Sequence, residues 1–450
     1  MKHKISLIGA GTGTFAINLI KDLCLTQSLD GSTISLMDID EHRLDAVHRF
    51  CVRYAREQKR ELEILKTTDR RECLQGADFV INSALDGGYA RMRDGWNVAK
   101  KWGYHFGGSL HIVHDEAFWV NFGQLQLMES IYRDMLDICP NAWYIMVANP
   151  VMAATTYFHR KYPGIRFVGM CHGYNGVYRM CSVMGLDRNK VSFETPGVNH
   201  FVWLTRFFYD GKDGTPLIDQ WVREQAPRYF EACDFSTDFG PKTIDLYRRY
   251  GLMPIGDTCT PGGGSWGWEY HSDAQTQLRW REDPDQWYNA VFSINQAQIQ
   301  SIIDAAYDES VCLSERFSTQ FSDEPMIPLI EALACDHGRI VIVNTINDGG
   351  FVEGVPLDFE VEIPAWVDAQ GVHGIHTTPL PKPLQAHILR DRVASVETEL
   401  YAYEHHSLEA LIDLVMMDPW TRSREQAEGF VREILELPGL SAMKAWYIGA

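Results

Sequence analysis

The sequence predicts an α/β fold made of an N-terminal Rossmann-type nucleotide-binding domain and a C-terminal α+β domain. Residues 5–23 read as a strand, a glycine-rich turn and a helix. A second strand at residues 33–37 is followed by an acidic residue, an order typical of dinucleotide binding. After residue 200 the alternation of strands and helices gives way to mixed segments. We therefore expect the two domains to span residues 1–195 and 196–450.

Size, charge and hydropathy narrow the class of protein. The chain has 450 residues and a formal net charge of −19, which argues against binding to nucleic acids or to anionic membranes. No run of about 18 apolar residues suggests a transmembrane helix. Met1 to Lys4 leads directly into a strand, without the apolar core of a signal peptide. The ten cysteines show no CxxC pair, so we expect free thiols in the cytoplasm.

The glycine turn is expected to bind NAD. Gly9, Gly11, Gly13 and Thr14 are the expected cofactor contacts of this turn, because the glycines let the backbone approach a pyrophosphate at the N-terminus of the following helix. Asp38 stands where an acid accepts hydrogen bonds from a ribose diol, and its charge would repel the 2′-phosphate of NADP. The alternative is a Rossmann-like unit that binds no nucleotide and carries an ordinary solvated Asp38.

Two further expected strands end at Asn82 and just before Asn149. Loops at the carboxyl ends of parallel strands line the ligand crevice, so both asparagines are expected to face the cofactor. Arg91, in a loop expected at residues 86–91, would contact an anionic or polyhydroxylated ligand. The alternatives are a solvated Arg91 and an Asn149 that only precedes a helix-starting proline.

Cys171 and His200 are the candidate metal ligands. Cys171 follows a strand expected at residues 165–170, and His200 precedes one expected at residues 201–208. A thiolate and an imidazole suit a divalent transition metal, and two protein ligands leave coordination positions open for a substrate. Taken alone, the cysteine could be a small buried hydrophobe and the histidine a hydrogen-bonded core residue.

The remaining segments are less specific. The ionisable residues His105, His111, His114, Asp115 and Glu116 form a dense cluster in the sequence without an assigned role. The glycine- and tryptophan-rich residues 261–271 are expected to fold over a sugar-like ligand, with a plain surface loop as the alternative. We also expect helices at residues 41–62, 118–137, 283–317 and 393–417, the last with a turn near His406, and strands at residues 339–344 and 357–363.

The ordered motifs resemble glycoside hydrolase family 4, the NAD- and divalent-metal-dependent glycosidases, over most of the chain. The matching segments are Gly9-Ala10-Gly11 with Asp38, residues 86–91 (DGGYAR), Asn149-Pro150, Cys171-His172-Gly173-Tyr174, Asn199-His200, residues 343–350 (VNTINDGG), residues 361–365 (VEIPA) and Asp418-Pro419. The fold that this resemblance implies is similar to that of lactate and malate dehydrogenases.

The resemblance implies a reaction unlike the two-carboxylate hydrolysis of most glycosidases. Bound NAD would oxidise the C3 hydroxyl of the sugar, and a base would then remove the acidified C2 proton while the metal polarises the C2 and C3 oxygens. The group at C1 leaves by elimination, water adds, and the hydride returns from NADH. The implied cofactors are NAD and Mn²⁺ or another divalent metal.

Residue roles follow by matching position. The metal ligands would be Cys171 and His200, the sugar contacts Arg91, Asn149, His172 and Asn199, and the C2 base Asp257, with Tyr250 as the second candidate. The segment Cys171-His172-Gly173 most resembles the members that cleave α-glucuronides and α-galacturonides. The resemblance also suggests a homodimer or homotetramer acting on a small glycoside.

Other functions stay open. A neutral α-galactosidase or α-glucosidase of the same family would carry the same metal pair. An NAD-dependent hydroxy-acid or sugar dehydrogenase of the lactate/malate type would share the fold. A non-catalytic NAD-binding regulator would not need both Cys171 and His200, and both are present.

Overall fold

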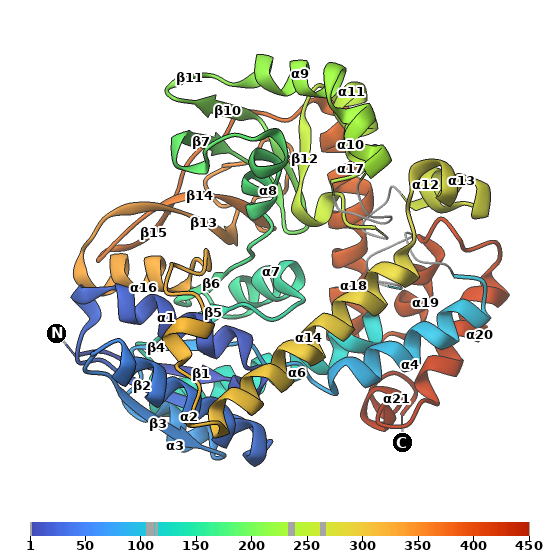
Figure 1. The fold of residues 1–450 in the computed structure, drawn as a ribbon. Helices are drawn as coiled ribbons and strands as arrows, with labels where there is room; N and C mark the ends of the chain where they lie inside the picture. The colour runs from blue at the N-terminus through green and yellow to red at the C-terminus, as the bar shows by residue number, and fades with distance from the viewer. Residues whose placement is uncertain (1, 105–111, 113–115, 233–238, 262–266, 450) are drawn as a thin grey trace.

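One large mixed sheet runs through the molecule (Figure 1). The computed structural model describes residues 2–104, 112, 116–232, 239–261 and 267–449. Within them the strand order is β12-β9-β8-β14-β13-β6-β5-β4-β1-β2-β3, with β15 paired to β14. The strands of this sheet are β1 Lys4–Ile8, β2 Thr33–Met37, β3 Glu63–Thr67, β4 Phe79–Asn82, β5 Trp143–Met146, β6 Phe167–Gly169, β8 Gly197–Val198, β9 Phe201–Leu204, β12 Met253–Ile255, β13 Arg339–Ile346, β14 Glu360–Asp368 and β15 Gly371–Gly374.

The N-terminal half of the sheet is parallel. Strands β3-β2-β1-β4-β5-β6 pair in parallel in that order, which is the order of a Rossmann fold. The chain reverses its direction of winding between β1 and β4, and ligands of such sheets bind outside the carboxyl ends of the strands at this point. The expected nucleotide-binding fold is therefore confirmed.

The second half continues the same sheet in antiparallel fashion. Strand β13 pairs antiparallel with both β6 and β14, and β8, β9 and β12 follow. The strand expected at residues 201–208 is divided: β9 joins the large sheet, while β10 (Arg206–Tyr209) joins a small sheet with β7 (Val191–Glu194) and β11 (Lys212–Asp213). The reason is burial, because β9 is buried throughout whereas β10 alternates. The domain boundary near residue 195 stays a prediction.

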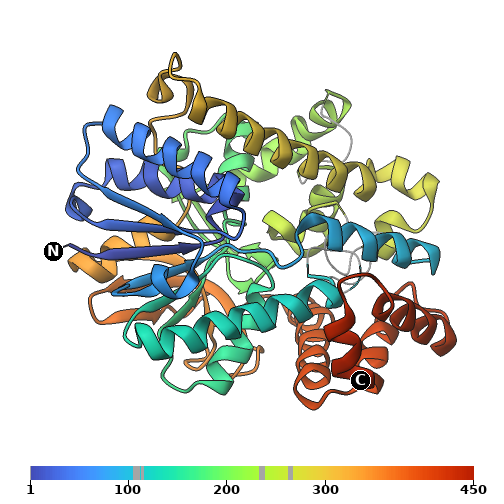
Figure 2. The ribbon, with the colours of Figure 1, turned by 90° about the horizontal axis from the view of Figure 1, so that it is seen from below.

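Helices cover both faces of the sheet. Figure 2 shows α1 and α2 (blue) on one face and α6 (teal) on the other, with the C-terminal helices gathered at one side. The helices of eight or more residues are α1 Thr14–Leu25, α2 Glu41–Glu57, α4 Gly88–Lys101, α6 Phe118–Ile138, α7 Val151–Lys161, α8 Asn175–Met184, α9 Thr215–Glu224, α11 Pro241–Tyr250, α14 Pro284–Tyr307, α16 Met326–Cys335, α18 Ala394–His405, α19 Leu408–Met416, α20 Arg424–Leu435 and α21 Ser441–Ile448. Within the described residues, no helix is both long and apolar enough to cross a membrane.

Two expected segments differ from the structure. The expected loop at residues 86–91 is wrong beyond Gly87, because α4 begins at Gly88 and Arg91 lies in its first turn. Gly87 has φ of 70° and serves as the N-cap, so the glycine pair starts a helix rather than extending a loop. The helix expected at residues 41–62 ends at Glu57, and the edge strand β3 follows it.

Candidate active site

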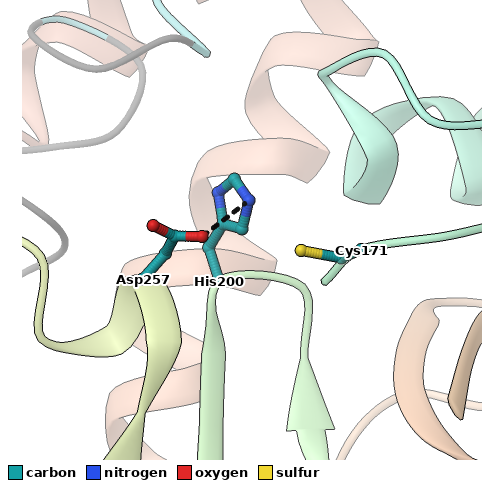
Figure 3. Close-up of side chains that lie close together, drawn as sticks. All are labelled: Cys171, His200 and Asp257. Atoms are coloured by element: carbon teal, nitrogen blue, oxygen red, sulfur yellow. Dashed lines mark ion pairs between the residues drawn. The ribbon is translucent and has the colours of Figure 1, made fainter. Parts of the chain in front are cut away.

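Three side chains from separate segments meet at one point (Figure 3). Cys171 follows β6, His200 occupies the turn between β8 and β9 with φ of 59°, and Asp257 lies in the short 3-10 helix Gly256–Thr258 after β12. One donor atom from each side chain lies within 4.8 Å of the other two. The structure thus brings the predicted pair Cys171 and His200 together and places the carboxylate of Asp257 beside them.

Glycines allow the segments that carry Cys171 and Asp257 to touch. A Cβ atom on Gly256 would lie 2.4 Å from the carbonyl oxygen of Gly173, and Gly256 has φ of +58°. A Cβ atom on Gly176 would lie 2.7 Å from the nitrogen of Gly256. Any larger residue at these positions would push the two segments apart.

His200 is buried between two carboxylates. Its Nε2 lies 3.5 Å from Asp257 Oδ2, and its Nδ1 lies 2.9 Å from Glu116 Oε1. Burial alone would lower the pKa of His200, but Asp257, Cys171 and Glu116 raise it well above its usual value. A carboxylate at Nδ1 fixes the tautomer that leaves Nε2 as a metal donor.

Cys171 is a half-buried thiol beside these groups. The N–H of Gly173 donates to its Sγ at 3.4 Å. Burial raises the pKa of Cys171 to about 11, and the nearby carboxyl of Glu362 adds to this effect. A thiol in this setting ionises when a cation is bound to it. The thiolate of Cys171 and the imidazole of His200 therefore fit a divalent first-row transition metal, with the Asp257 carboxylate next to that position.

Asp257 is held in place but stays accessible. The hydroxyl of Thr260 donates to Asp257 Oδ1 at 2.8 Å, while Oδ2 faces His200. The side chain of Asp257 is 34% exposed, whereas that of His200 is 5% exposed. A ligand can therefore reach Asp257 more easily than His200.

A layer of buried polar side chains lies under the three donors. Asn199 is fully buried, and its backbone N–H donates to Glu360 at 3.1 Å while its amide donates to Glu362 at 3.2 Å. Burial raises the pKa of Glu360 well above its usual range and that of Glu362 to about 7. The contact of Asn199 with substrate stays a prediction, since the structure uses its amide within this layer.

His172, the residue after Cys171, is exposed, unlike the members of this layer. Its side chain is 57% exposed, and its Nδ1 lies 3.6 Å from Glu324 Oε1. The carboxylate of Glu324, which can accept a hydrogen bond from this ring, raises the pKa of His172. The structure therefore places a readily protonated imidazole next to Cys171, with Nε2 left for a ligand.

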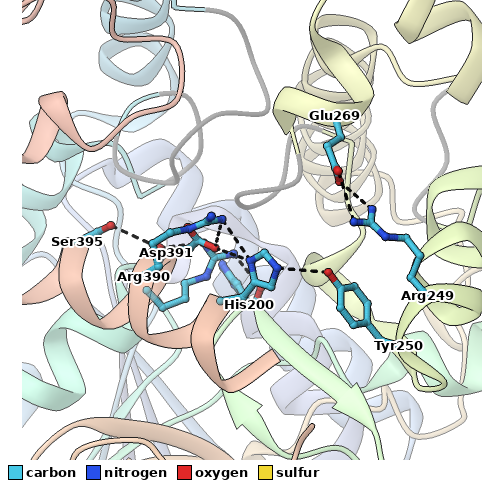
Figure 4. A network of polar contacts seen from close by, with 9 residues as sticks. His200, Arg249, Tyr250, Glu269, Arg390, Asp391 and Ser395 are labelled. Atoms are coloured by element: carbon cyan, nitrogen blue, oxygen red, sulfur yellow. Dashed lines mark hydrogen bonds and ion pairs between the residues drawn. The ribbon is translucent and has the colours of Figure 1, made fainter. Parts of the chain in front are cut away.

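Tyr250 lies at the other end of β12 from Asp257. Its hydroxyl is 3.3 Å from His387 Nε2, and His387 Nδ1 is 3.1 Å from Asp391 Oδ2. Figure 4 shows Tyr250 within this polar network near His200. Of the two candidate bases, Asp257 is the one whose side chain lies with Cys171 and His200.

Arg91 is paired with Asp86 through its guanidinium. A Cβ atom on Gly123 of α6 would clash with both Asp86 and Arg91, so α6 covers this ion pair closely. Asn149 lies nearby, with its carbonyl accepting from Gln124 at 2.7 Å, and Gln124 also accepts from the N–H of Asp86 at 2.6 Å. The structure thus joins the predicted Arg91 and Asn149 segments through Gln124.

The nucleotide turn has the predicted geometry. The N–H of Gly11 donates to Asp38 Oδ2 at 2.7 Å, and a Cβ atom on Gly11 would lie 2.7 Å from the Asp38 carboxylate. Gly9 has φ of +90°, and a Cβ atom there would lie 2.5 Å from the backbone of Ala84. Gly13 has φ of +77° and is the N-cap of α1, which begins at Thr14. Only glycine at positions 9 and 11 lets the turn pack this closely against Ala84 and Asp38.

Asn82 fixes Ala84, the residue on which Gly9 of the turn packs. It is fully buried, its amide donates to the hydroxyl of Tyr144 at 3.0 Å, and its carbonyl oxygen accepts from the N–H of Ala84 at 3.0 Å. A contact of Asn82 with the cofactor stays a prediction.

Several site residues have no distinctive sequence signal. Glu116 was part of an unassigned cluster, and Glu360 and Glu362 resemble the polar face of a half-exposed strand. The close approach of Gly256 to Gly173 also has no signal in the sequence. His105, His111, His114 and Asp115 of that cluster lie outside the described residues, as do residues 262–266 of the expected sugar-covering loop.

Comparison with known proteins agrees with these features. A family model described as family 4 glycosyl hydrolase matches residues 4–186, and the model of its C-terminal domain matches residues 195–421. An α-glucosidase of Erwinia rhapontici is 26% identical over 83% of this chain and 85% of its own length. An α-galacturonidase of Thermoanaerobacterium saccharolyticum is 24% identical over 96% of this chain and 95% of its own length.

Solved structures share the fold. A 6-phospho-α-glucosidase from gut microorganisms, in complex with NAD and Mn²⁺, matches with a TM-score of 0.80 at 19% identity over 97% of this chain and 98% of its own. A malate dehydrogenase of Cryptosporidium parvum matches with a TM-score of 0.51 at 15% identity over 90% of this chain and all of its own. The expected likeness to the malate dehydrogenase fold is confirmed.

Proposed function

The chain belongs to glycosyl hydrolase family 4, and from this premise we propose that it cleaves the α-glycosidic bond of an α-uronide, either a glucuronide or a galacturonide. Membership in the family makes it a glycoside hydrolase. Support for a uronide comes from the Cys171-His172-Gly173 segment and from relatives named α-galacturonidase.

The cofactors we propose are NAD and Mn²⁺ or another divalent ion. The glycine turn with Asp38 would hold NAD, and Cys171 with His200 would hold the ion. When bound, NAD supplies a hydride acceptor for C3 of the sugar, and the ion draws electron density from the C2 and C3 oxygens.

Asp257 is the proposed base. Its exposed carboxylate would take the proton from C2, and Thr260 fixes one of its oxygens so that the other faces the donor group. The C1–O bond to the leaving group then breaks by elimination, water adds at C1, and the sugar is reduced again at C3. Tyr250 is the second candidate, but its hydroxyl is bound to His387.

The sugar contacts we propose are Arg91, Asn149 and His172, with Asn199 behind them. His172, held by Glu324, offers a cation for the carboxylate of a uronate. The single observation that supports this function most strongly is the meeting of Cys171, His200 and Asp257 in a chain with a dinucleotide turn.

The substrate is tested with a panel of p-nitrophenyl α-glycosides: glucuronide, galacturonide, galactoside and glucoside. We expect kcat/KM on a uronide to exceed that on either neutral sugar. A higher kcat/KM on the galactoside or glucoside would mean that the substrate is a neutral α-glycoside, as the name of the Erwinia α-glucosidase suggests for that relative. Activity on a small glycoside, a homodimer or homotetramer and a cytoplasmic location are further proposals for this chain.

A further inference from the structure

We propose that Lys242, Glu282 and His271 form a buried triad that positions Asp257 for the reaction. The inference rests on the proposed function, because it gives Asp257 its role in proton removal. Lys242 lies in α11, His271 ends the short helix Gly267–His271, and Glu282 follows the helix Ala274–Trp280 (Figure 1).

Lys242 and His271 both contact one carboxylate oxygen of Glu282. Lys242 Nζ donates to Glu282 Oε2 at 2.9 Å, and His271 Nε2 lies 2.7 Å from the same oxygen. The side chains of Lys242, Glu282 and His271 are 0%, 1% and 0% exposed. Lysine and glutamate are almost never buried to this extent unless they are paired.

One further hydrogen bond links the triad to the site. Lys242 Nζ also donates to the carbonyl oxygen of Thr260 at 3.1 Å. The hydroxyl of the same threonine donates to Asp257 Oδ1 at 2.8 Å. The ammonium group is therefore two hydrogen-bonded steps from the proposed base.

The segment that carries Asp257 is fixed at a second point. The hydroxyl of Thr258 accepts from the N–H of Val202 at 2.8 Å and donates to the carbonyl of Val202 at 3.1 Å. Val202 belongs to β9, which begins directly after His200. Thr258 thus ties the segment to the strand of His200, and Lys242 ties it to α11.

The triad also holds both ends of the chain between Thr260 and His271. Lys242 binds the carbonyl of Thr260, and Glu282 binds the ring of His271. Since Lys242 and Glu282 are bonded to each other, Thr260 and His271 are both tied to the same ion pair.

Stability alone does not explain this arrangement. Glu282 Oε1 and His271 Nδ1 are buried and have no partner among the described residues. A buried ion pair with unsatisfied atoms gains little over apolar side chains of similar volume, because both charges lose their hydration. Precise placement of the carbonyl of Thr260 is the benefit that an apolar replacement would lose.

The test removes the pair without leaving a lone buried charge. The variant Lys242→Met/Glu282→Leu is compared with Arg160→Met/Glu397→Leu, which removes a partly exposed ion pair between α7 and α18. We expect the triad variant to keep its melting temperature within about 5 °C, to lose at least about tenfold in kcat and to change KM less than about twofold. The control variant is expected to keep wild-type kcat.

Two further measurements test whether a loss of kcat comes from misplacement of Asp257 and not from another effect of the substitutions. Thr260→Val is expected to lower kcat by a similar factor, and adding it to the triad variant should cost little more, because both changes act on Asp257. Amide hydrogen exchange of residues 256–260 should rise in the triad variant and not in the control. This second readout needs no turnover.

The outcomes are distinct. Unchanged kcat together with unchanged exchange at residues 256–260 would overturn the triad proposal. A loss of kcat that only follows a fall in melting temperature would also overturn it. A wild-type protein inactive on every glycoside would refute the proposed function, while faster exchange in the triad variant would still support its hold on the Asp257 segment.

Discussion

Glu116 Oε1 lies 2.9 Å from Nδ1 of His200, on the side of the imidazole opposite Asp257. The ring is therefore oriented from behind by one carboxylate while its Nε2 faces the other donors. Partners of this kind orient metal-binding histidines and raise their basicity.

Replacing Glu116 by Gln should weaken Mn²⁺ binding by about 10–100-fold, because the amide no longer favours the tautomer with Nε2 free. Mn²⁺ titration monitored by electron paramagnetic resonance measures the change, and excess Mn²⁺ should restore much of the activity. Glu428→Gln, at a surface pair with Arg432, serves as the control. Equal Mn²⁺ affinity in the Glu116 variant and the wild type would contradict the role of Glu116.

Cys171→Ser should abolish metal-dependent turnover while NAD binding persists, since the hydroxyl is a poor substitute for a thiolate ligand. We expect kcat/KM to fall by at least about a hundredfold. Cys312→Ser is the matched control, because Cys312 is exposed and its thiol lies beside Glu57 of α2. Full turnover of the Cys171 variant with Mn²⁺ supplied would remove Cys171 from the metal site.

Asp257→Asn should lower kcat by about a thousandfold or more, because the amide does not accept the C2 proton. Tyr250→Phe should lower kcat by less than about tenfold, since the hydroxyl is bound to His387. Steady-state rates on the best glycoside decide between the two. A larger loss in the tyrosine variant would exchange the roles of the two residues.

Binding of a uronide should weaken as pH rises through the pKa of His172. Glu324 raises this pKa, so the imidazolium that would meet a uronate carboxylate is present below it and is lost above it. In Glu324→Gln the rise of KM should begin at lower pH, while KM for a neutral galactoside should show no such shift. Identical pH profiles of KM for both substrates would rule out His172 as the carboxylate contact.

Asp38→Ala should raise the Kd for NAD about tenfold and reduce the preference over NADP, because the carboxylate at the end of β2 no longer accepts from the ribose or repels a 2′-phosphate. Fluorescence titration with both nucleotides measures this. Unchanged discrimination between them would assign the preference to another residue.

The parts of the fold that follow short-range rules were predictable. The strand, glycine turn and helix around Gly11 depend on local periodicity and on positions that only glycine can fill. The residues around His200 are different. Glu116 reaches it from a distant segment, and Glu362 sits in a strand whose alternating pattern suggests solvent on one face, although both faces are buried there. Such contacts depend on how the antiparallel strands extend the sheet, which local periodicity does not encode.

The same limit applies to the divided strand at residues 201–208 and to Arg91. A continuous apolar run does not reveal that the chain changes sheets after β9. Two glycines before Arg91 suggest a loop as readily as the N-terminus of a helix. Tertiary packing decided both cases.

The most direct test of the oxidation and elimination reaction is hydrolysis of the best α-glycoside in D₂O with NAD, Mn²⁺ and reductant, followed by NMR of the released sugar. We expect deuterium at C2 of the product, no accumulation of NADH, and no product when either cofactor is omitted. A product with hydrogen retained at C2 would contradict proton removal at C2 and indicate direct hydrolysis. Accumulating NADH without glycoside cleavage would instead indicate a dehydrogenase.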